Sequence, residues 1–130
     1  MNQRREDAAR REQLSRSSTL HEATQAQPLI DEFLAEVKRR GIAPEPLRAR
    51  LLDGREVKTS QLGWYIRANK SVAIGENGEF YVLTVPGGWK ERLRGVTVPA
   101  TPPPLVVGRG GRDGDSGDLS TFLAWRLAQG

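Results

Sequence analysis

The chain has no cysteine, and its 130 residues include a single histidine, His21. The absence of cysteine excludes disulfide bonds, thiolate metal sites and cysteine nucleophiles. No apolar run approaches the ~18 residues that a membrane-spanning helix needs, so no membrane association is expected. The first residues are charged and contain no apolar segment, so we expect no secretory signal and a cytoplasmic location.

A strong excess of one charge is also missing. Twenty Lys and Arg stand against sixteen Asp and Glu, which gives a net charge of +4. Bases exceed acids by five to four in residues 1–27, by seven to six in 28–60 and by five to three in 61–107, and the two are equal in 108–130. Because no segment is a strongly basic block, the charge indicates solubility more than phosphate binding. Arg outnumbers Lys sixteen to four, which is typical of a GC-rich, bacterial genome.

Residues 1–27 are polar and nearly without large apolar side chains. Arginines and acids alternate there at spacings that would support a solvated helix as far as about Ser15, but little could anchor such a helix. We therefore expect a polar mobile arm over residues 1–27 and a single α+β domain over residues 28–130.

A helix is expected to begin at Pro28 and to end before Gly41. Proline suits the first helical turn, and basic residues at 38–40 favour the negative end of the helix dipole. The apolar residues fall on one stripe that must pack against another element. This stripe contains Leu29, Ile30, Phe33, Leu34 and Val37.

The middle of the chain has the pattern of an antiparallel sheet. Asn77-Gly78 lies between two runs of β-branched and aromatic residues, which is a strong signal for a tight hairpin, and Asp53-Gly54 indicates a second one. About five strands are expected, at 47–51, 55–59, 62–67, 71–74 and 79–85, and residues 92–98 could add a last one. Prolines at 99 and 102–104 favour an extended crossing segment.

A second helix is expected after Asp118, which is a good N-cap. Its apolar stripe contains Leu119, Phe122, Leu123 and Leu127, with Trp125 at one edge. The predicted fold class is α+β: a small twisted antiparallel sheet of about five strands, packed on one face by an N-terminal and a C-terminal helix.

A loop rich in glycine, residues 108–117, precedes this second helix. Its backbone could cradle an anion, and Asp113, Asp115 and Asp118 could bind a metal ion. However, the glycine spacing is not G-x-G-x-x-G, and the positions where an EF-hand needs Gly and Glu are occupied by Asp118 and Ala124. We expect a structural loop, with no cofactor and no metal site.

Catalytic motifs are not evident in the sequence. The only histidine lies in the expected arm, and Glu76 and Glu79 flank a hairpin turn, where carboxylates are usually solvated. A hydrolytic enzyme that uses a carboxylate pair is therefore the least favoured hypothesis.

The leading hypothesis is a non-enzymatic binding or adaptor protein that contacts a partner protein through the sheet face and the N-terminal arm. Trp64 and Ile66 alternate with Tyr65 and Arg67, so the latter pair would share the open face of the sheet. Trp89 follows a Pro-Gly-Gly break and could be exposed. The expected partner-binding residues are Tyr65, Arg67, Trp89 and Arg92.

The alternative is a weak nucleic-acid-binding protein with a basic sheet face. The residues expected to form this face are Arg48, Arg50, Lys90, Arg92 and Arg94. A solvated sheet face commonly carries the same residue types, and no nucleic-acid-binding motif is present. A homo-oligomer could also form through an exposed sheet edge.

Overall fold

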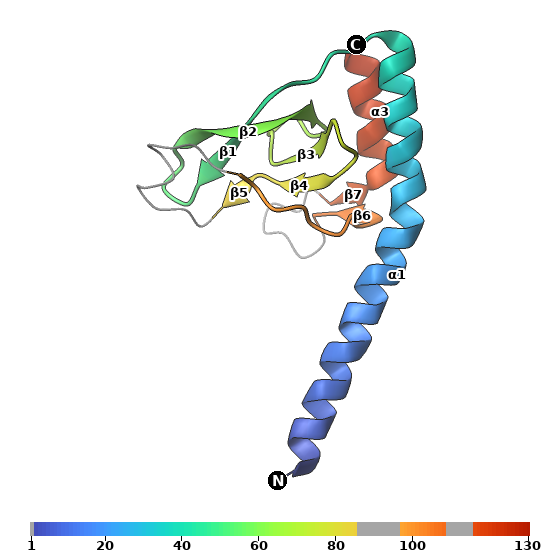
Figure 1. Ribbon diagram of the computed structural model, residues 1–130, viewed down its shortest axis with the longest axis vertical. Coiled ribbons are helices and arrows are strands. Elements are labelled where there is room, and N and C mark those ends of the chain that lie inside the picture. The colour runs from blue at the N-terminus through green and yellow to red at the C-terminus, as the bar shows by residue number, and fades with distance from the viewer. Residues whose placement is uncertain (1, 86–96, 109–115) are drawn as a thin grey trace.

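The structure, a computed structural model, describes residues 2–85, 97–108 and 116–130 (Figure 1). It contains the helices α1 (Asn2–Arg40) and α3 (Leu119–Gln129) and a sheet of β1 (Glu45–Leu51), β2 (Glu56–Tyr65), β3 (Val72–Gly75), β4 (Phe80–Val82) and β5 (Thr84–Val85). A separate two-stranded ribbon is formed by β6 (Val106–Val107) and β7 (Gly117–Asp118). The predicted α+β class is confirmed, as are the hairpin turns at Asp53-Gly54 and Asn77-Gly78.

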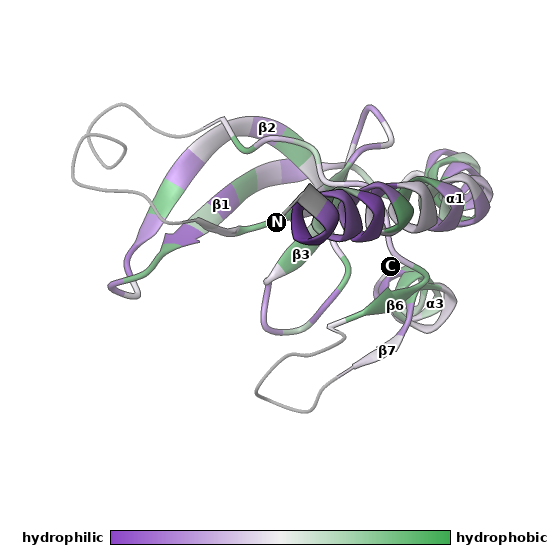
Figure 2. Cartoon of the chain, turned by 90° about the horizontal axis from the view of Figure 1, so that it is seen from below, coloured by the Kyte–Doolittle hydropathy of each residue, from purple (hydrophilic) through white to green (hydrophobic). Residues whose placement is uncertain are grey.

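Helix α1 is longer than the sequence indicated. It runs for 39 residues with Pro28 in its interior, so the expected start at Pro28 is wrong. Only its second half packs on the body, through Ala26, Ile30, Phe33 and Val37, while the first half projects away from it (Figure 1). Figure 2 shows that this projecting half is mostly hydrophilic. The predicted mobility of residues 1–27 stays a prediction.

The sheet curls until its two ends meet. Its strand order is β4-β3-β2-β1-β5, with antiparallel pairs except for β5, which is parallel to β1. Strands β4 and β5 lie at opposite ends of this order, yet only Leu83 separates them in the chain. The Leu83 N–H donates to the Ser71 carbonyl (2.9 Å), and the Leu83 carbonyl accepts from the Arg50 N–H (2.7 Å). Leu83 therefore joins both ends of the sheet.

Two predicted strand boundaries differ from those in the structure. The segments expected as separate strands at 55–59 and 62–67 form the single strand β2, which ends at Tyr65, and the segment 79–85 divides into β4 and β5. Residues 92–96 of the expected last strand lie outside the described residues, and residues 97 and 98 are not in a strand.

Two apolar clusters form, one on each face of the sheet. On the outer face, Trp64, Ile66 and Ile74 pack with α1 and α3, which confirms the expected helix-covered face. The Phe33 and Trp64 rings meet edge to face with their centroids 5.9 Å apart, and the Trp64 indole N–H donates to the Ile42 carbonyl (3.1 Å). The second cluster, inside the curl, contains Leu47, Ala49, Leu51, Val57, Tyr65, Ala73, Tyr81, Leu83 and Val98.

Candidate functional site

A cleft lies where the turn between β2 and β3 approaches α3. After β2 the chain leaves the sheet at Ile66, and the Lys70 N–H donates to the Arg67 carbonyl (3.0 Å). Lys70 has a positive φ of 60°, and the Asn69 carboxamide oxygen accepts from the backbone N–H of Ser71 at 3.0 Å and from its hydroxyl at 2.6 Å. These local hydrogen bonds hold the turn in one conformation, so the side chains at 67 and 69 have a defined direction.

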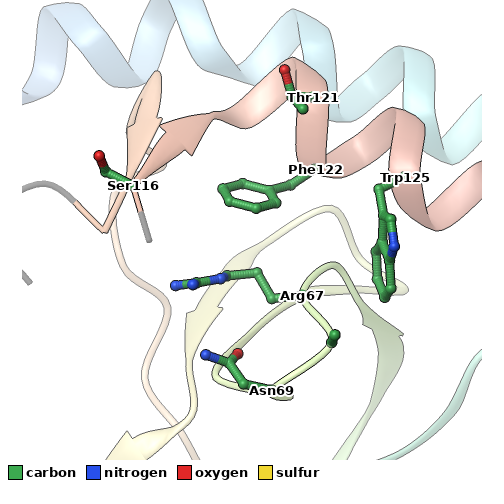
Figure 3. Close-up of a pocket in the computed structure, with 7 residues that line it drawn as sticks. Arg67, Asn69, Ser116, Thr121, Phe122 and Trp125 are labelled. Carbon is green, nitrogen blue, oxygen red and sulfur yellow. The ribbon is translucent and has the colours of Figure 1, made fainter. Parts of the chain in front are cut away.

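Helix α3 supplies the opposite wall. Leu119 and Leu123 anchor it in the core, which leaves Phe122 partly buried and Trp125 37% exposed. The Arg67 guanidinium carbon lies 5.2 Å from the centroid of the Phe122 ring. Figure 3 shows these two side chains next to each other between the turn and α3. This stacking, a cation–π contact, directs the Arg67 side chain along the wall of the cleft.

The cleft has a volume of about 410 Å³, which is within the range of small ligand sites. The described residues that line it are Arg67, Ala68, Asn69, Ser116, Thr121, Phe122 and Trp125. They combine one cation, two aromatic rings and several uncharged hydrogen-bonding groups, and none of them is acidic. Such a lining can bind a carboxylate and a neighbouring apolar group.

Of the four expected partner-binding residues, the structure describes Tyr65 and Arg67, and these two do not share an open sheet face. Tyr65 is only 8% exposed, and its hydroxyl accepts a hydrogen bond from the Arg48 N–H (2.8 Å). The expectation that Tyr65 lies on an open sheet face is therefore wrong, because the curl of the sheet turns that face inward. The expectation that Arg67 shares its face is also wrong, because β2 ends at Tyr65 and Arg67 turns toward Phe122 on α3. Trp89 and Arg92 lie outside the described residues.

The expected basic face is described only in part. Arg48 and Arg50 are exposed on β1, and their partners on β2 are Lys58 and Glu56 respectively. Lys90, Arg92 and Arg94 lie outside the described residues. The sequence interpretation missed Lys58, although its alternation with Val57 and Glu56 in a return strand was the available signal.

The other cleft residues were also missed. Phe122 and Trp125 were assigned to packing, and Asn69, Ser116 and Thr121 were not singled out. Asn69 comes shortly after the expected strand at 62–67, and asparagine is favoured in turns. This is the one signal in the sequence that could have drawn attention to the segment.

Other candidate chemistry finds little support in the described part of the chain. His21 is exposed on α1, with its Nε2 3.4 Å from the Gln25 side-chain nitrogen. Among the described residues, no group of three or more His, Asp or Glu side chains is placed to hold a metal ion, and no helix is both long and apolar enough to span a membrane. Asp118 occupies the N-cap position of α3 without a side-chain capping bond, and Asp113 and Asp115 lie outside the described residues.

No known family model matches the chain, and no curated protein or solved structure matches it either. The proposals below therefore depend on the geometry of the chain itself.

Proposed function

We propose that this chain is a non-enzymatic binding protein that contacts a partner protein, and that the cleft beside α3 is its contact site. The observation that supports this proposal is the solvent-exposed indole of Trp125 beside the stacked Arg67–Phe122 pair. Trp and Arg are the residue types most enriched among side chains that dominate binding energy at protein interfaces. A concave, partly apolar surface around them is typical of a binding site.

The chemistry of the lining defines the partner segment. The Asn69 amide and the Thr121 hydroxyl are donors that favour a carboxylate, and the positive charge of Arg67 beside them favours an anion as well. The rings of Phe122 and Trp125 favour an adjacent apolar side chain. The expected ligand is a segment of a partner protein with an acidic group next to a large apolar side chain.

Selection from a random peptide library tests this proposal. The full chain should enrich peptides that pair Asp, Glu or a terminal carboxylate with an aromatic or aliphatic residue. Titration with a selected peptide should change the fluorescence of Trp125, identified by comparison with a Trp125→Phe variant. Arg67→Gln and Trp125→Ala should each weaken binding at least about tenfold, as expected for a residue worth more than ~1.4 kcal/mol.

Two exposed residues on the distant β1–β2 hairpin give matched controls. Arg55→Gln and Leu52→Ala remove the same kinds of group, a surface cation and an exposed apolar side chain, and should leave peptide affinity unchanged. If no sequence class is enriched, or if the two cleft variants bind the selected peptides as well as the unchanged chain, the proposal is wrong.

A second candidate function is weak nucleic-acid binding, and the cross-strand pairing of Arg48 with Lys58 favours it. Like charges directly opposite on a sheet destabilise it, and neither residue, nor Arg50 beside them, forms an ion pair with any described residue. A phosphate backbone along β1 and β2 would neutralise these charges.

Fluorescence polarisation with a single-stranded oligonucleotide at several salt concentrations tests this second candidate. Three phosphate contacts would give a slope of log affinity against log salt of about −2. Arg48→Glu with Lys58→Glu should abolish binding, whereas Lys38→Glu at the end of α1 should not. Absence of binding at low salt, or a slope near zero, would remove the nucleic-acid hypothesis.

A further inference from the structure

Besides the cleft at Arg67 and Trp125, two further surfaces of the described structure lack a partner, and α1 contributes to both. The first is the half of the helix that projects from the body in Figure 1, residues 2–18. It carries Leu14, which is 69% exposed. The second is a groove of about 350 Å³ between the other half of α1 and α3. The groove has an apolar floor and charged residues, and is lined by Leu29, Glu32, Phe33, Glu36, Arg40, Ser120, Leu123, Ala124 and Leu127.

The residues of the two surfaces have matching spacings along the helix. Helix α1 contributes five residues to the groove, and four of them, Leu29, Phe33, Glu36 and Arg40, follow intervals of four, three and four residues, with Glu32 beside Phe33. The projecting half has the same intervals at Asp7, Arg11, Leu14 and Ser18. Because a helix repeats every ~3.6 residues, each set lies along one side of α1.

The two sets are complementary when they run in opposite directions. Antiparallel alignment places Asp7 against Arg40, Arg11 against Glu36 and Leu14 against Phe33. Both charge pairs are then of opposite sign, and the exposed leucine meets the apolar floor of the groove. The small side chain of Ser18 falls opposite Leu29.

We propose that the partner of the groove is a second copy of this chain, whose projecting helix lies antiparallel along α1 and α3 to form a two-fold symmetric dimer. In such a dimer each copy inserts its projecting half into the groove of the other. The two-fold axis repeats this contact, so the projecting half and the groove are covered in both copies. The dimer surface is separate from the cleft at Arg67 and Trp125, so its success or failure does not decide the binding proposal.

The described sheet edges favour this route over strand pairing between copies. The Thr101 N–H donates to the Phe80 carbonyl on β4 (2.9 Å), and β5 at the other end is only two residues long. The groove also carries a negative charge at neutral pH. Hydrogen bonds from Arg39 and Arg40 lower the pKa of Glu36 to about 2, so its carboxylate is ionised. The contact is largely polar, so we expect a dimer that weakens as salt increases.

Sedimentation equilibrium of the full chain over a wide concentration range tests the dimer. Leu14→Ser should raise the dimer dissociation constant at least about tenfold, because the substitution removes the apolar anchor from both of the symmetric contacts. Leu20→Ser is the matched control: this leucine is 63% exposed on the same helix, but lies about 120° away around the axis and outside the contact face. It should leave the constant unchanged.

A charge exchange tests the orientation. Arg11→Glu and Glu36→Arg should each weaken the dimer about tenfold, with helix content checked by circular dichroism. The double variant restores opposite charges at positions 11 and 36 in both symmetric contacts. It should return the dissociation constant to within about threefold of the unchanged chain. A monomer at all concentrations, equal effects of the Leu14 and Leu20 variants, or a double variant as weak as the singles would overturn the proposal.

Discussion

At the residue scale, one hydroxyl links the inward face of the sheet to an irregular point in its ladder. The pairing of β1 with β2 shifts register between Pro46 and Arg48, and the Arg48 N–H is bonded to the Tyr65 hydroxyl. Tyr65→Phe would leave this N–H without its acceptor and should lower the free energy of unfolding by about 1–2 kcal/mol in urea titrations. Tyr81→Phe removes a hydroxyl that donates to the exposed Glu79 carboxylate (2.9 Å), so its effect should be smaller. Equal losses of unfolding free energy in the two variants would contradict the role given to the Tyr65 hydroxyl.

Tyr65 should also make the folded protein less stable at alkaline pH. Burial raises the pKa of Tyr65 above its ordinary value of 10.0, because the phenolate would be poorly solvated. A raised folded-state pKa contributes stability that is fully present below pH 10 and is lost as the pH rises through that folded-state value. The free energy of unfolding of the unchanged chain should therefore fall more steeply above pH 10 than that of Tyr65→Phe. If the two plots of unfolding free energy against pH are parallel, the loss of stability at alkaline pH does not come from Tyr65.

Gly63 is required by close approach between strands rather than by backbone conformation. A Cβ atom at this position would lie 2.2 Å from the carbonyl oxygen of Ile74, a backbone atom that cannot move aside alone. Gly63→Ala should cost about 2–3 kcal/mol of unfolding free energy in urea titrations. Gly54→Ala at the hairpin tip is the comparison: its φ is +88° and nothing lies within 4 Å, so only the conformational cost of about 1 kcal/mol applies. A Gly54 variant as costly as the Gly63 variant would refute the steric argument.

At the element scale, the segments with a regular apolar pattern were the ones that the sequence predicted well. Helix α3 has its stripe where expected, with Leu119 and Leu123 buried and Trp125 at the exposed edge. The Asn77-Gly78 turn forms because Gly78 adopts a φ of +86°. The first half of α1 was missed as a continuous helix because its sequence is polar on all sides, and a polar segment has no periodicity that separates a helix from a disordered arm.

The end of α1 gives an element-scale prediction for acid stability. The Glu36 carboxylate accepts hydrogen bonds from Arg39 Nε (3.1 Å) and Arg40 Nε (2.7 Å), and these bonds lower its pKa from 4.5 to about 2. A lowered folded-state pKa gives stability that is present above pH 4.5 and is lost as the pH falls toward 2. Denaturant titrations between pH 2 and 6 should therefore show a shallower acid decline for Glu36→Gln.

Replacement of the two arginines is the matching control, because it removes the cause of the lowered pKa and keeps the carboxylate. A chain with Arg39→Gln and Arg40→Gln should have the same shallower acid decline. An acid decline as steep as that of the unchanged chain in either variant would contradict the role assigned to these hydrogen bonds.

At the scale of the whole molecule, the curl of the sheet decides which side chains are available. The alternation along β2 correctly separated Trp64 and Ile66 from Tyr65, but it could not show that the second face would be enclosed by the meeting of β4 and β5 at Leu83. The cleft could not be predicted for a similar reason, because Arg67 and Trp125 are distant in sequence and line one cleft only after α3 packs on the sheet. Local patterns report which side of an element is apolar, and long-range closure decides which sides remain in solvent.

The unequal support along α1 gives the last prediction. Residues 26–37 are held by the apolar core, whereas no described apolar cluster includes a residue between 2 and 18. Most helical stability in proteins comes from the packing of an apolar face. In dilute solution, amide hydrogen exchange should be fast for residues 2–18 and slowed at least about a hundredfold for residues 26–37. If α1 pairs between copies, a higher protein concentration should slow exchange in residues 4–18, and Leu14→Ser should remove that effect. Equally slow exchange along the whole helix in dilute solution would show that the projecting half is stable by itself, contrary to this account.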